Sequence, residues 1–599
     1  MSNFWLHPSL ILIFGGLLLP LVPRALKKGY LLLIPVLVFA RTLTLNAGSF
    51  GHVHFMDWVL VFGRVDRLSL VFGYIMALMC ILGTLYGMHV KEDRQHIAAW
   101  FYVAGSIGAI YAGDFITLFL FWELMAFSSV FLVWFRGRRE SLGAGYRYLL
   151  VHVAGGLALL AGMVWHCRTQ GSWEFVQLNV QQPTPAICLI MVGFILNAAV
   201  PPLHAWLPDA YGEATFNGSV FMCAFTTKTA VYALCRGFAG MEILVPLGVI
   251  MALYGVVYAV LENDCRRLLA YHIISQVGYM VAGVGLGTEM AINGACAHAF
   301  AHILYKGLLF MGCGAVLHMT GESKFTQLGG LWKKMPWTFV FTLIGGLSIS
   351  AFPLFSGFVS KSMIVSAGFE EHKLWVGFLL LLASAGTFLH TGLKVPYFIW
   401  FGKNQPRAEV WQRASEPPIN MNVAMAITSF LCIFIGCYPV WLYRMLPYPE
   451  EAMKYLPQVY SGYHISETLQ ILLFTGLGFF LLLKKLTPEA KISLDLDWPY
   501  RMGGRAFLWL ARWPIQTLDT FVGELYRLAG LAPLMVSARV AALFDSRVID
   551  GLVDGLADSI HGIGARLRLV QRGQMQQNLA FAFGVAAVLI VAFILYTNR

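Results

Sequence analysis

The chain has 599 residues, of which 58% are hydrophobic and only 12% carry a formal charge. A soluble domain has about a quarter of its residues charged, so this composition excludes an ordinary soluble protein and predicts a membrane protein. We interpret the net charge of +11 as loop charge that sets membrane topology, and expect no nucleic-acid partner.

Residues 1–95 contain hydrophobic segments that are predicted to form N-terminal transmembrane helices. The first apolar run, residues 8–23, has no basic stretch before it and no clear small-residue cleavage site. We therefore expect a retained first transmembrane helix and not a signal peptide. Because a bilayer core of about 30 Å needs roughly 20 apolar residues per helix, the apolar runs of the whole chain predict an all-α polytopic fold with about 16 transmembrane helices.

Residues 96–400 are predicted to form about ten more helices and to contain a duplication. An apolar segment is interrupted at Pro201 and Pro202 in the first half, and another at Pro353 in the second half. Proline disrupts the helical hydrogen-bond ladder, and non-helical backbone at membrane depth is tolerated only inside protein or beside water. Paired breaks indicate a transport site at a repeat interface. The alternative is two ordinary proline kinks.

The same region places charged side chains inside apolar runs, where each costs about 2.5–3.5 kcal/mol even on lenient insertion scales. An isolated lysine there tends to lose its proton and an isolated glutamate tends to gain one, so both protonation states are accessible. His298, His302 and Lys306 recur at i, i+4 and share one helix face, and imidazole passes protons near neutral pH. The candidate proton-relay residues are Glu123, Lys228, Lys306, Lys361, Lys394, His298 and His302.

Structural alternatives exist for each of these residues. Lys361 and Lys394 could extend to a membrane interface, and Glu123 and Lys228 could form a purely structural ion pair. The histidine stripe could be a helix-packing network. A zinc site there is disfavoured because no HExxH carboxylate accompanies it. The ten cysteines form no CxxC pair, so we expect no metal centre and no cofactor in this chain.

The C-terminal third is predicted to have three parts. Residues 401–484 add transmembrane helices, and residues 578–599 form a last one. Between them, residues 485–577 contain no apolar run that we judge long enough to span a membrane. Ile549, Leu552 and Leu556 begin an apolar stripe with aspartates on another face, which predicts an amphipathic helix lying along lipid or neighbouring helices. The basic residues near its end are expected to keep it on the cytoplasmic side; they are Arg566, Arg568 and Arg572.

Basic residues also gather in alternate loops, for example at Arg136, Arg138 and Arg139 and at Arg266 and Arg267. The positive-inside rule places such loops in the cytoplasm. With an even number of helices, both termini are then predicted on the outer, periplasmic side of a bacterial inner membrane.

Four stretches, in this order, resemble the antiporter-like subunits shared by respiratory complex I, membrane hydrogenases and Mrp-type multisubunit Na⁺/H⁺ antiporters. They are residues 201–210 (PPLHAWLPDA), 268–279, 298–310 and 356–361, with a weaker echo at 548–553 and in the final helix. The resemblance implies two inverted five-helix repeats, a broken helix in each, and a chain of polar residues near the membrane midplane. It also assigns family roles to residues of this chain: the glutamate of helix 5 to Glu123, the lysine of helix 8 to Lys228, the lysine of the HxxxK helix to Lys306, and the lysine after the second break to Lys361.

One position departs from the family pattern. The family usually places a lysine shortly before the histidine of the PxHxWLPDA stretch, and this chain has Asn197 there. An amide cannot hold and release a proton in this pH range. Either Lys228 takes over as the partner of Glu123, or the first half of the path works differently.

Several functions are compatible with this resemblance. The leading one is a subunit of an Mrp-type cation/proton antiporter, similar to its D-type subunit. The second is the proton-pumping arm of an NADH:quinone oxidoreductase or membrane hydrogenase, which the long amphipathic C-terminal segment favours. A membrane subunit of a bicarbonate-uptake complex and a non-transporting scaffold are further alternatives. In the transport readings the partners are other membrane subunits and the lipid bilayer, the cargo is protons with or without Na⁺, and no catalytic redox site is expected in this chain.

Overall fold

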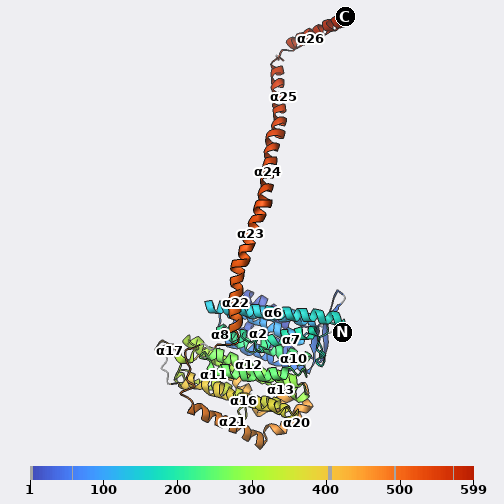
Figure 1. Cartoon of the computed structure of the whole chain (residues 1–599). Coiled ribbons are helices and arrows are strands. Elements are labelled where there is room, and N and C mark those ends of the chain that lie inside the picture. Colours follow the sequence, from blue (N-terminus) through green and yellow to red (C-terminus); the bar gives the residue numbers. More distant parts are fainter. Residues whose placement is uncertain (1–4, 57, 403–407, 492–493, 571–572, 599) are drawn as a thin grey trace. The chain divides into compact units, whose positions relative to one another are not determined.

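The computed structural model describes residues 5–56, 58–402, 408–491, 494–570 and 573–598. Arg572, one of the basic residues used above to predict topology, lies outside them. The chain divides into two compact units, Met1–Asp497 and Trp498–Arg599, which are described separately. Figure 1 labels the elements.

The first unit opens with helices and one hairpin. Its elements are α1 (Pro8–Leu18), η1 (Leu19–Leu21), α2 (Lys27–Leu43), β1 (Gly48–Phe55), β2 (Trp58–Val65) and α3 (Arg67–Gly87). The two strands pair antiparallel, from Gly48 opposite Val65 to Phe55 opposite Trp58. This hairpin was not expected, and it is the one β-sheet among the described residues. Gly63 accommodates it against the N-terminal segment, because a Cβ there would lie 2.3 Å from the ring of Trp5.

Two successive groups of helices follow. The first group is α4 (Asp93–Tyr111), α5 (Phe115–Trp134), α6 (Arg139–Gln170), α7 (Pro185–Asn197), α8 (Trp206–Glu213), α9 (Gly218–Met222) and α10 (Thr226–Gly237). The second is α11 (Leu244–Leu261), α12 (Cys265–Leu286), α13 (Glu289–Thr320), η2 (Phe325–Gln327), η3 (Leu331–Lys333), α14 (Pro336–Ile349), α15 (Ser356–Glu370), α16 (Leu374–Thr387), η4 (Phe388–Lys394) and η5 (Tyr397–Phe401).

Each group contains one interrupted helix. In the first, α7 ends at Asn197 and α8 begins at Trp206; in the second, α14 ends at Ile349 and α15 begins at Ser356. Ala199 (φ 60°) and Ala351 (φ 58°) adopt the left-handed conformation within the two interruptions. That conformation costs an alanine about 1–2 kcal/mol, so the surrounding packing must hold it.

Helix α13 forms the centre of the first unit. It packs against α3, α12, α14, α15 and α18, and nearly all of its residues are buried. Its 32 residues correspond to about 48 Å at 1.5 Å per residue, more than a bilayer core requires. Helix α12 is buried along its whole length. Polar side chains on these two helices therefore lie in the protein interior.

The first unit closes with α17 (Ala408–Arg413), α18 (Ile419–Cys437), α19 (Pro439–Tyr443), α20 (Pro449–Val459) and α21 (Gly462–Leu481). The second unit contains α22 (Trp498–Leu510), η6 (Ala511–Ile515), α23 (Gln516–Tyr526), η7 (Arg527–Leu531), α24 (Ala532–Phe544), η8 (Asp545–Ile549), α25 (Asp550–Val570) and α26 (Met575–Thr597). From α22 to α25 these elements form one helical run, Trp498–Val570.

Within the described residues, 12 helices are long and apolar enough to cross a membrane, and shorter apolar helices cover Pro8–Leu21, Pro185–Asn197 and Pro336–Ile349. The chain is thus a largely helical, polytopic membrane protein, and the count of about 16 spans stays a prediction. One expectation was wrong: the run Trp498–Val570 does contain an 18-residue window with the hydropathy of a span. Its placement along the membrane surface therefore stays a prediction too.

Candidate functional site

A direct contact between two buried titratable groups joins α13 to α12. Lys306 is fully buried, and its Nζ lies 3.1 Å from Nδ1 of His272. The other ring nitrogen of His272 lies 3.1 Å from the hydroxyl of Thr387 on α16. The ring of His390 stands edge-on to His272 at 4.7 Å between centroids. Sequence reasoning predicted Lys306 but assigned no role to either of these histidines.

His298 and His302 occupy the same helix as Lys306, as predicted. Both are fully buried. Nδ1 of His298 lies 3.2 Å from the hydroxyl of Ser360 on α15. Neither ring nitrogen of His302 has a hydrogen-bond partner among the described residues. The rings of His298 and His302 lie 6.2 Å apart between centroids, and the ring of Tyr305 stands edge-on to His302 at 5.3 Å.

Lys228 and Glu123 do not meet. Lys228 is fully buried on α10, and its Nζ donates to the carbonyl oxygen of Cys223 at 2.6 Å and to the hydroxyl of Thr227 at 3.1 Å. Glu123 lies on α5 against α6, where a Cβ on Gly156 would come within 2.1 Å of its Oε1. That oxygen has no hydrogen-bond partner in the described part of the chain. The structural ion pair considered above is therefore not formed.

Asn197 holds a histidine that sequence reasoning missed. Its side-chain oxygen lies 3.0 Å from Nδ1 of His152 on α6. The imidazole packs against the rings of Tyr148 and Trp206, at 4.1 and 4.5 Å between centroids. Nε2 of His152 has no partner among the described residues. An amide–imidazole contact thus occupies the position where the family usually has a lysine.

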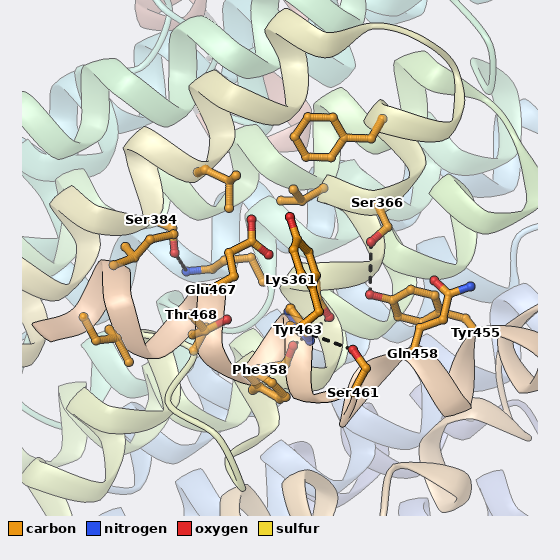
Figure 2. Close-up of a pocket in the computed structure, with 18 of the residues that line it drawn as sticks. Phe358, Lys361, Ser366, Ser384, Tyr455, Gln458, Ser461, Tyr463, Glu467 and Thr468 are labelled. Carbon is orange, nitrogen blue, oxygen red and sulfur yellow. Dashed lines mark hydrogen bonds between the residues drawn. The ribbon is translucent and has the colours of Figure 1, made fainter.

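Lys361 borders a cavity of about 570 Å³. Only 3% of the residue is exposed. Its Nζ donates to the carbonyl oxygen of Ile349 at 3.1 Å and approaches the hydroxyl of Ser384 at 3.4 Å. Glu467 lines the same cavity and is labelled in Figure 2. The cavity places both polar and aromatic side chains of α20 and α21 beside Lys361; they include Tyr455, Gln458, Ser461, Tyr463, His464 and Thr468.

Lys394 has a local structural task. Its Nζ donates to the carbonyl oxygens of Val260 and Glu262, at 2.6 and 2.7 Å. These carbonyls lie at the C-terminal end of α11, where a cation compensates for unpaired carbonyls and for the helix dipole. The contact explains the burial of Lys394 without any ion movement. Whether it also belongs to the relay stays a prediction.

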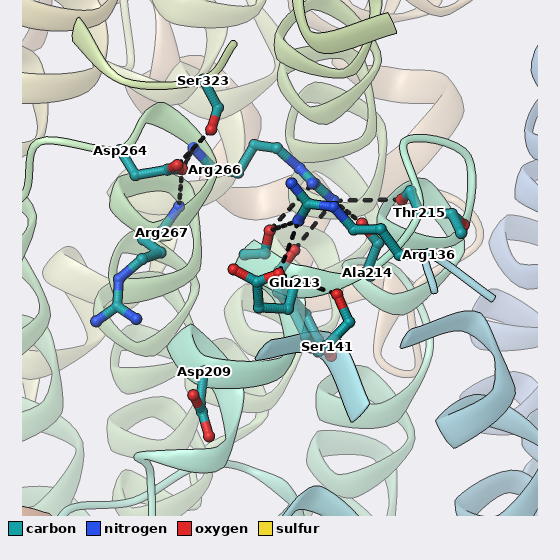
Figure 3. A network of polar contacts seen from close by, with 12 residues as sticks. Arg136, Ser141, Asp209, Glu213, Ala214, Thr215, Asp264, Arg266, Arg267 and Ser323 are labelled. Atoms are coloured by element: carbon teal, nitrogen blue, oxygen red, sulfur yellow. Dashed lines mark hydrogen bonds and ion pairs between the residues drawn. The ribbon is translucent and has the colours of Figure 1, made fainter. Parts of the chain in front are cut away.

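A polar network at the end of α8 positions the first break. Arg266 on α12 is fully buried and donates to four carbonyl oxygens, those of Tyr211, Gly212, Ala214 and Thr215, at 2.8 to 3.2 Å. Arg136 donates to the Gly212 carbonyl at 2.7 Å and to the Glu213 carboxylate at 3.2 Å. Figure 3 shows the two guanidinium groups side by side over this turn. The second half of the core thereby holds the broken helix of the first.

Comparisons with known proteins give the same class as the fold. Residues 112–388 match the family described as NADH:quinone oxidoreductase/Mrp antiporter, transmembrane region. The chain is 28% identical over 439 residues to Hydrogenase-4 component B of Escherichia coli (strain K12), covering 66% of this chain and 65% of that protein. It is 28% identical over 492 residues to Na(+)/H(+) antiporter subunit A1 of Staphylococcus aureus (strain MRSA252), and this match covers 72% of this chain and 61% of that protein. It thus spans less than two thirds of the length of these curated relatives.

Two solved structures share the fold. A chain of the Mrp complex from Dietzia sp. DQ12-45-1b matches with a TM-score of 0.66 and 21% identity, covering 78% of this chain and 98% of that one. A chain of the membrane-bound sulfane sulfur reductase, an archaeal respiratory membrane complex, matches with a TM-score of 0.68 and 23% identity. This match covers 98% of this chain and 99% of that one.

The chain is therefore a multi-pass membrane protein with an antiporter-like transmembrane core. Its residues 112–388 match the NADH:quinone oxidoreductase/Mrp antiporter family, and the resemblance seen in the sequence is confirmed.

Proposed function

We propose that the chain is an ion-translocating subunit of a multisubunit membrane complex, and that it moves protons through the buried lysines and histidines of its core. The contact between Lys306 and His272 carries this proposal. No ion pair among the described residues involves Lys306. A buried charge without a counter-charge is costly, so the pair favours one shared proton that can sit on either base.

The proposed path follows the contacts described above. In this path Lys228 on α10 is proposed to exchange protons with His302 and Lys306 on α13, and His272 connects Lys306 to His390. His298 and Lys361 extend the path toward the cavity lined by Glu467. Glu123 is proposed as the acidic group of the first half, reached by way of ordered water because it has no direct contact with Lys228.

We further propose that the core consists of two inverted five-helix repeats, α4–α10 and α11–α16. The two interruptions support this division. A matching detail in the two halves supports it as well. The backbone of Asp114, before α5, forms an isolated antiparallel β-bridge with Glu174, and the backbone of Asp264, before α12, forms one with Lys324. Each aspartate also caps the helix that follows it. A transport site between repeats of this kind lies near the membrane midplane.

The parent complex we propose is an Mrp-type antiporter that exchanges protons for Na⁺, in which this chain is a large, D-like subunit in a bacterial inner membrane. Its relatives are an A1 subunit and a hydrogenase component, so the subunit type rests on the sequence resemblance. The proton-pumping arm of a redox complex is the second candidate. One observation favours it: the match to the archaeal respiratory complex covers 98% of this chain, whereas the match to the Mrp complex covers 78%.

Purification with native partners in mild detergent separates these two candidates. We expect small hydrophobic companion chains by mass spectrometry and no flavin or iron–sulfur absorbance. Co-purifying flavin or iron–sulfur subunits would instead make this chain the pumping arm of a redox complex.

The relay itself is tested by Lys306→Met in the assembled complex. Methionine fills a similar volume but cannot carry a proton, so we expect proton flux in inverted membrane vesicles to fall at least about a hundredfold. Lys454→Met is the matched control, because Lys454 is exposed and pairs with Glu451 on the surface of α20. Near-normal flux in Lys306→Met, at normal abundance in the membrane, would contradict the proposal.

A further inference from the structure

Asp495 is a buried carboxylate that lies outside the path proposed above. It belongs to the connector between α21 and α22, and only 6% of its side chain is exposed. Its carboxylate faces three different elements of the core. Nε2 of His204, between α7 and α8, lies 3.2 Å from Oδ1. The hydroxyl of Tyr271 on α12 donates to Oδ2 at 2.5 Å, and the hydroxyl of Tyr254 on α11 donates to Oδ1.

These donors keep Asp495 ionised. Burial raises the pKa of the Asp495 carboxyl, but the hydrogen bonds from His204, Tyr254 and Tyr271 outweigh it and hold that pKa below its ordinary value. The group is therefore charged at neutral pH. A buried carboxylate with this many donors from separate elements is a specific arrangement, since an unsatisfied one would cost several kcal/mol.

The contact fixes the state of His204. A carboxylate only accepts hydrogen bonds, so Nε2 of His204 must carry the proton that points at Asp495. In the neutral ring, Nδ1 is then a proton acceptor. That atom is buried and has no partner among the described residues. A carboxylate that orients an imidazole through one nitrogen leaves the other free to take a proton, and it stabilises the imidazolium that forms.

His204 is also connected to the first break. Two residues further on, Trp206 donates from its indole nitrogen to the carbonyl of Leu196 at 3.0 Å and packs against His152. His152 in turn contacts Asn197. The imidazole therefore lies in the interrupted helix whose usual family lysine is replaced.

We propose that His204 transfers protons at the first break, through Nδ1, and that Asp495 is its positioning residue. The proton arrives at and leaves from Nδ1, while the Nε2–H bond to Asp495 is kept throughout. The other titratable groups in contact with the Asp495 carboxylate are Tyr254 of α11 and Tyr271 of α12. Arg267 and Glu262 act on Tyr271, and Tyr258 of α11 donates to the neighbouring carbonyl of Leu494. The inference rests on the proposed function, since it gives that path an entry in its first half.

The pH profile of proton flux in vesicles containing the assembled complex tests this inference. In Asp495→Asn the imidazolium loses its counter-charge and forms only at lower pH. We expect flux at neutral pH to fall about tenfold, which is the usual scale for an orienting carboxylate, and the optimum to move to lower pH. Asp495→Glu should restore part of both. His204→Gln should lose at least as much flux as Asp495→Asn, and the double variant should lose no more than His204→Gln alone.

Two further variants distinguish the orientation of His204 by Asp495 from simple attachment of the connector to the core. Tyr258→Phe removes only a 3.0 Å hydrogen bond to the carbonyl of Leu494 on the same connector, so the pH optimum should not move. Tyr271→Phe takes one donor from the carboxylate but leaves its charge, so more of that charge acts on His204 and the optimum should move to higher pH. Tyr271→Phe also tests the inference if the Asp495→Asn variant does not reach the membrane. Glu489→Gln is the surface control, because Glu489 is exposed and pairs with Lys491.

The outcomes are distinct. If the wild-type complex and Glu489→Gln transport protons while Asp495→Asn and Tyr271→Phe keep the wild-type pH profile, the inference about His204 is overturned and the proposed function stands. If the wild-type complex shows no flux, the proposed function fails and the inference fails with it.

Discussion

Lys228 shows how the core holds a lysine without a carboxylate. Its Nζ rests on the carbonyl oxygen of Cys223, the residue that ends the short helix α9. A carbonyl at a helix C-terminus carries partial negative charge and stabilises a nearby cation. This stabilisation is weaker than that of a full counter-charge, so the ammonium and the neutral amine stay close in free energy.

We therefore expect Lys228→Ala to abolish proton flux, a loss of at least about a hundredfold, because the proposed path loses its buried titratable group on α10. The measurement is flux in proteoliposomes that contain the assembled complex at equal protein content. Lys373→Ala, at a partly exposed position between α15 and α16, is the control. A correctly assembled Lys228→Ala variant with nearly normal flux would exclude Lys228 from the path.

Spacing predicted part of this site. His298, His302 and Lys306 recur at helical intervals, and the structure places all three on α13. His152, His272 and His390 carry no such signal, because each is a single histidine on a separate helix and only the tertiary fold brings it to its partner. The local sequence also gave no indication that Asp495, far along the chain, would face His204. Burial alone predicted Lys394 as a relay residue, although its contacts are those of a helix cap.

At the scale of elements, the two interrupted helices create helix ends inside the protein. A helix that ends inside protein leaves unpaired carbonyls, and these must find donors. Arg266 supplies them at the end of α8, where one planar guanidinium reaches the carbonyls of Tyr211, Gly212, Ala214 and Thr215. A lysine has only three donors on a single atom and cannot reproduce this fork.

Arg266→Ala should destabilise the core by about 3 kcal/mol or more, since several buried carbonyls lose their donors at once. Arg266→Lys should recover only part of this loss. Thermal unfolding of the purified complex, followed by loss of its monodisperse peak, measures the effect. Arg138→Ala removes an exposed arginine nearby and should leave the unfolding temperature unchanged; an equal shift in both variants would refute the role of Arg266.

The positions of prolines predicted some elements and not others. Pro201, Pro202 and Pro353 indicated both interruptions, because proline cannot continue the helical ladder. The hairpin β1–β2 was missed because its strands lie between apolar helices and were counted with them. Counting apolar runs also gave no reliable number of spans, since α7 and α14 are shorter than a bilayer core requires.

At the scale of the whole molecule, the second unit differs from the first in its surface. None of the described residues in α22 to α25 is buried, and large apolar side chains such as Phe521, Leu552 and Ile560 are exposed. A run of this length with so much exposed apolar surface needs lipid or other protein chains to cover it. The apolar stripe and the aspartates opposite it support the proposed lateral helix against partner subunits.

A chain truncated after Asp497 tests this division of labour. The first unit has its own core, so we expect the truncated chain to insert, fold and unfold at nearly the wild-type temperature. It retains Asp495 and the connector, so the contact with His204 should survive. It loses the exposed apolar run, so affinity purification should recover fewer partner subunits by quantitative mass spectrometry.

Deletion of α26 alone is the matched control, because it leaves the run Trp498–Val570 intact and should keep most partners. A truncated chain that recovers the full set of partners would show that the first unit alone makes the assembly contacts, and the lateral role of the second unit would be wrong.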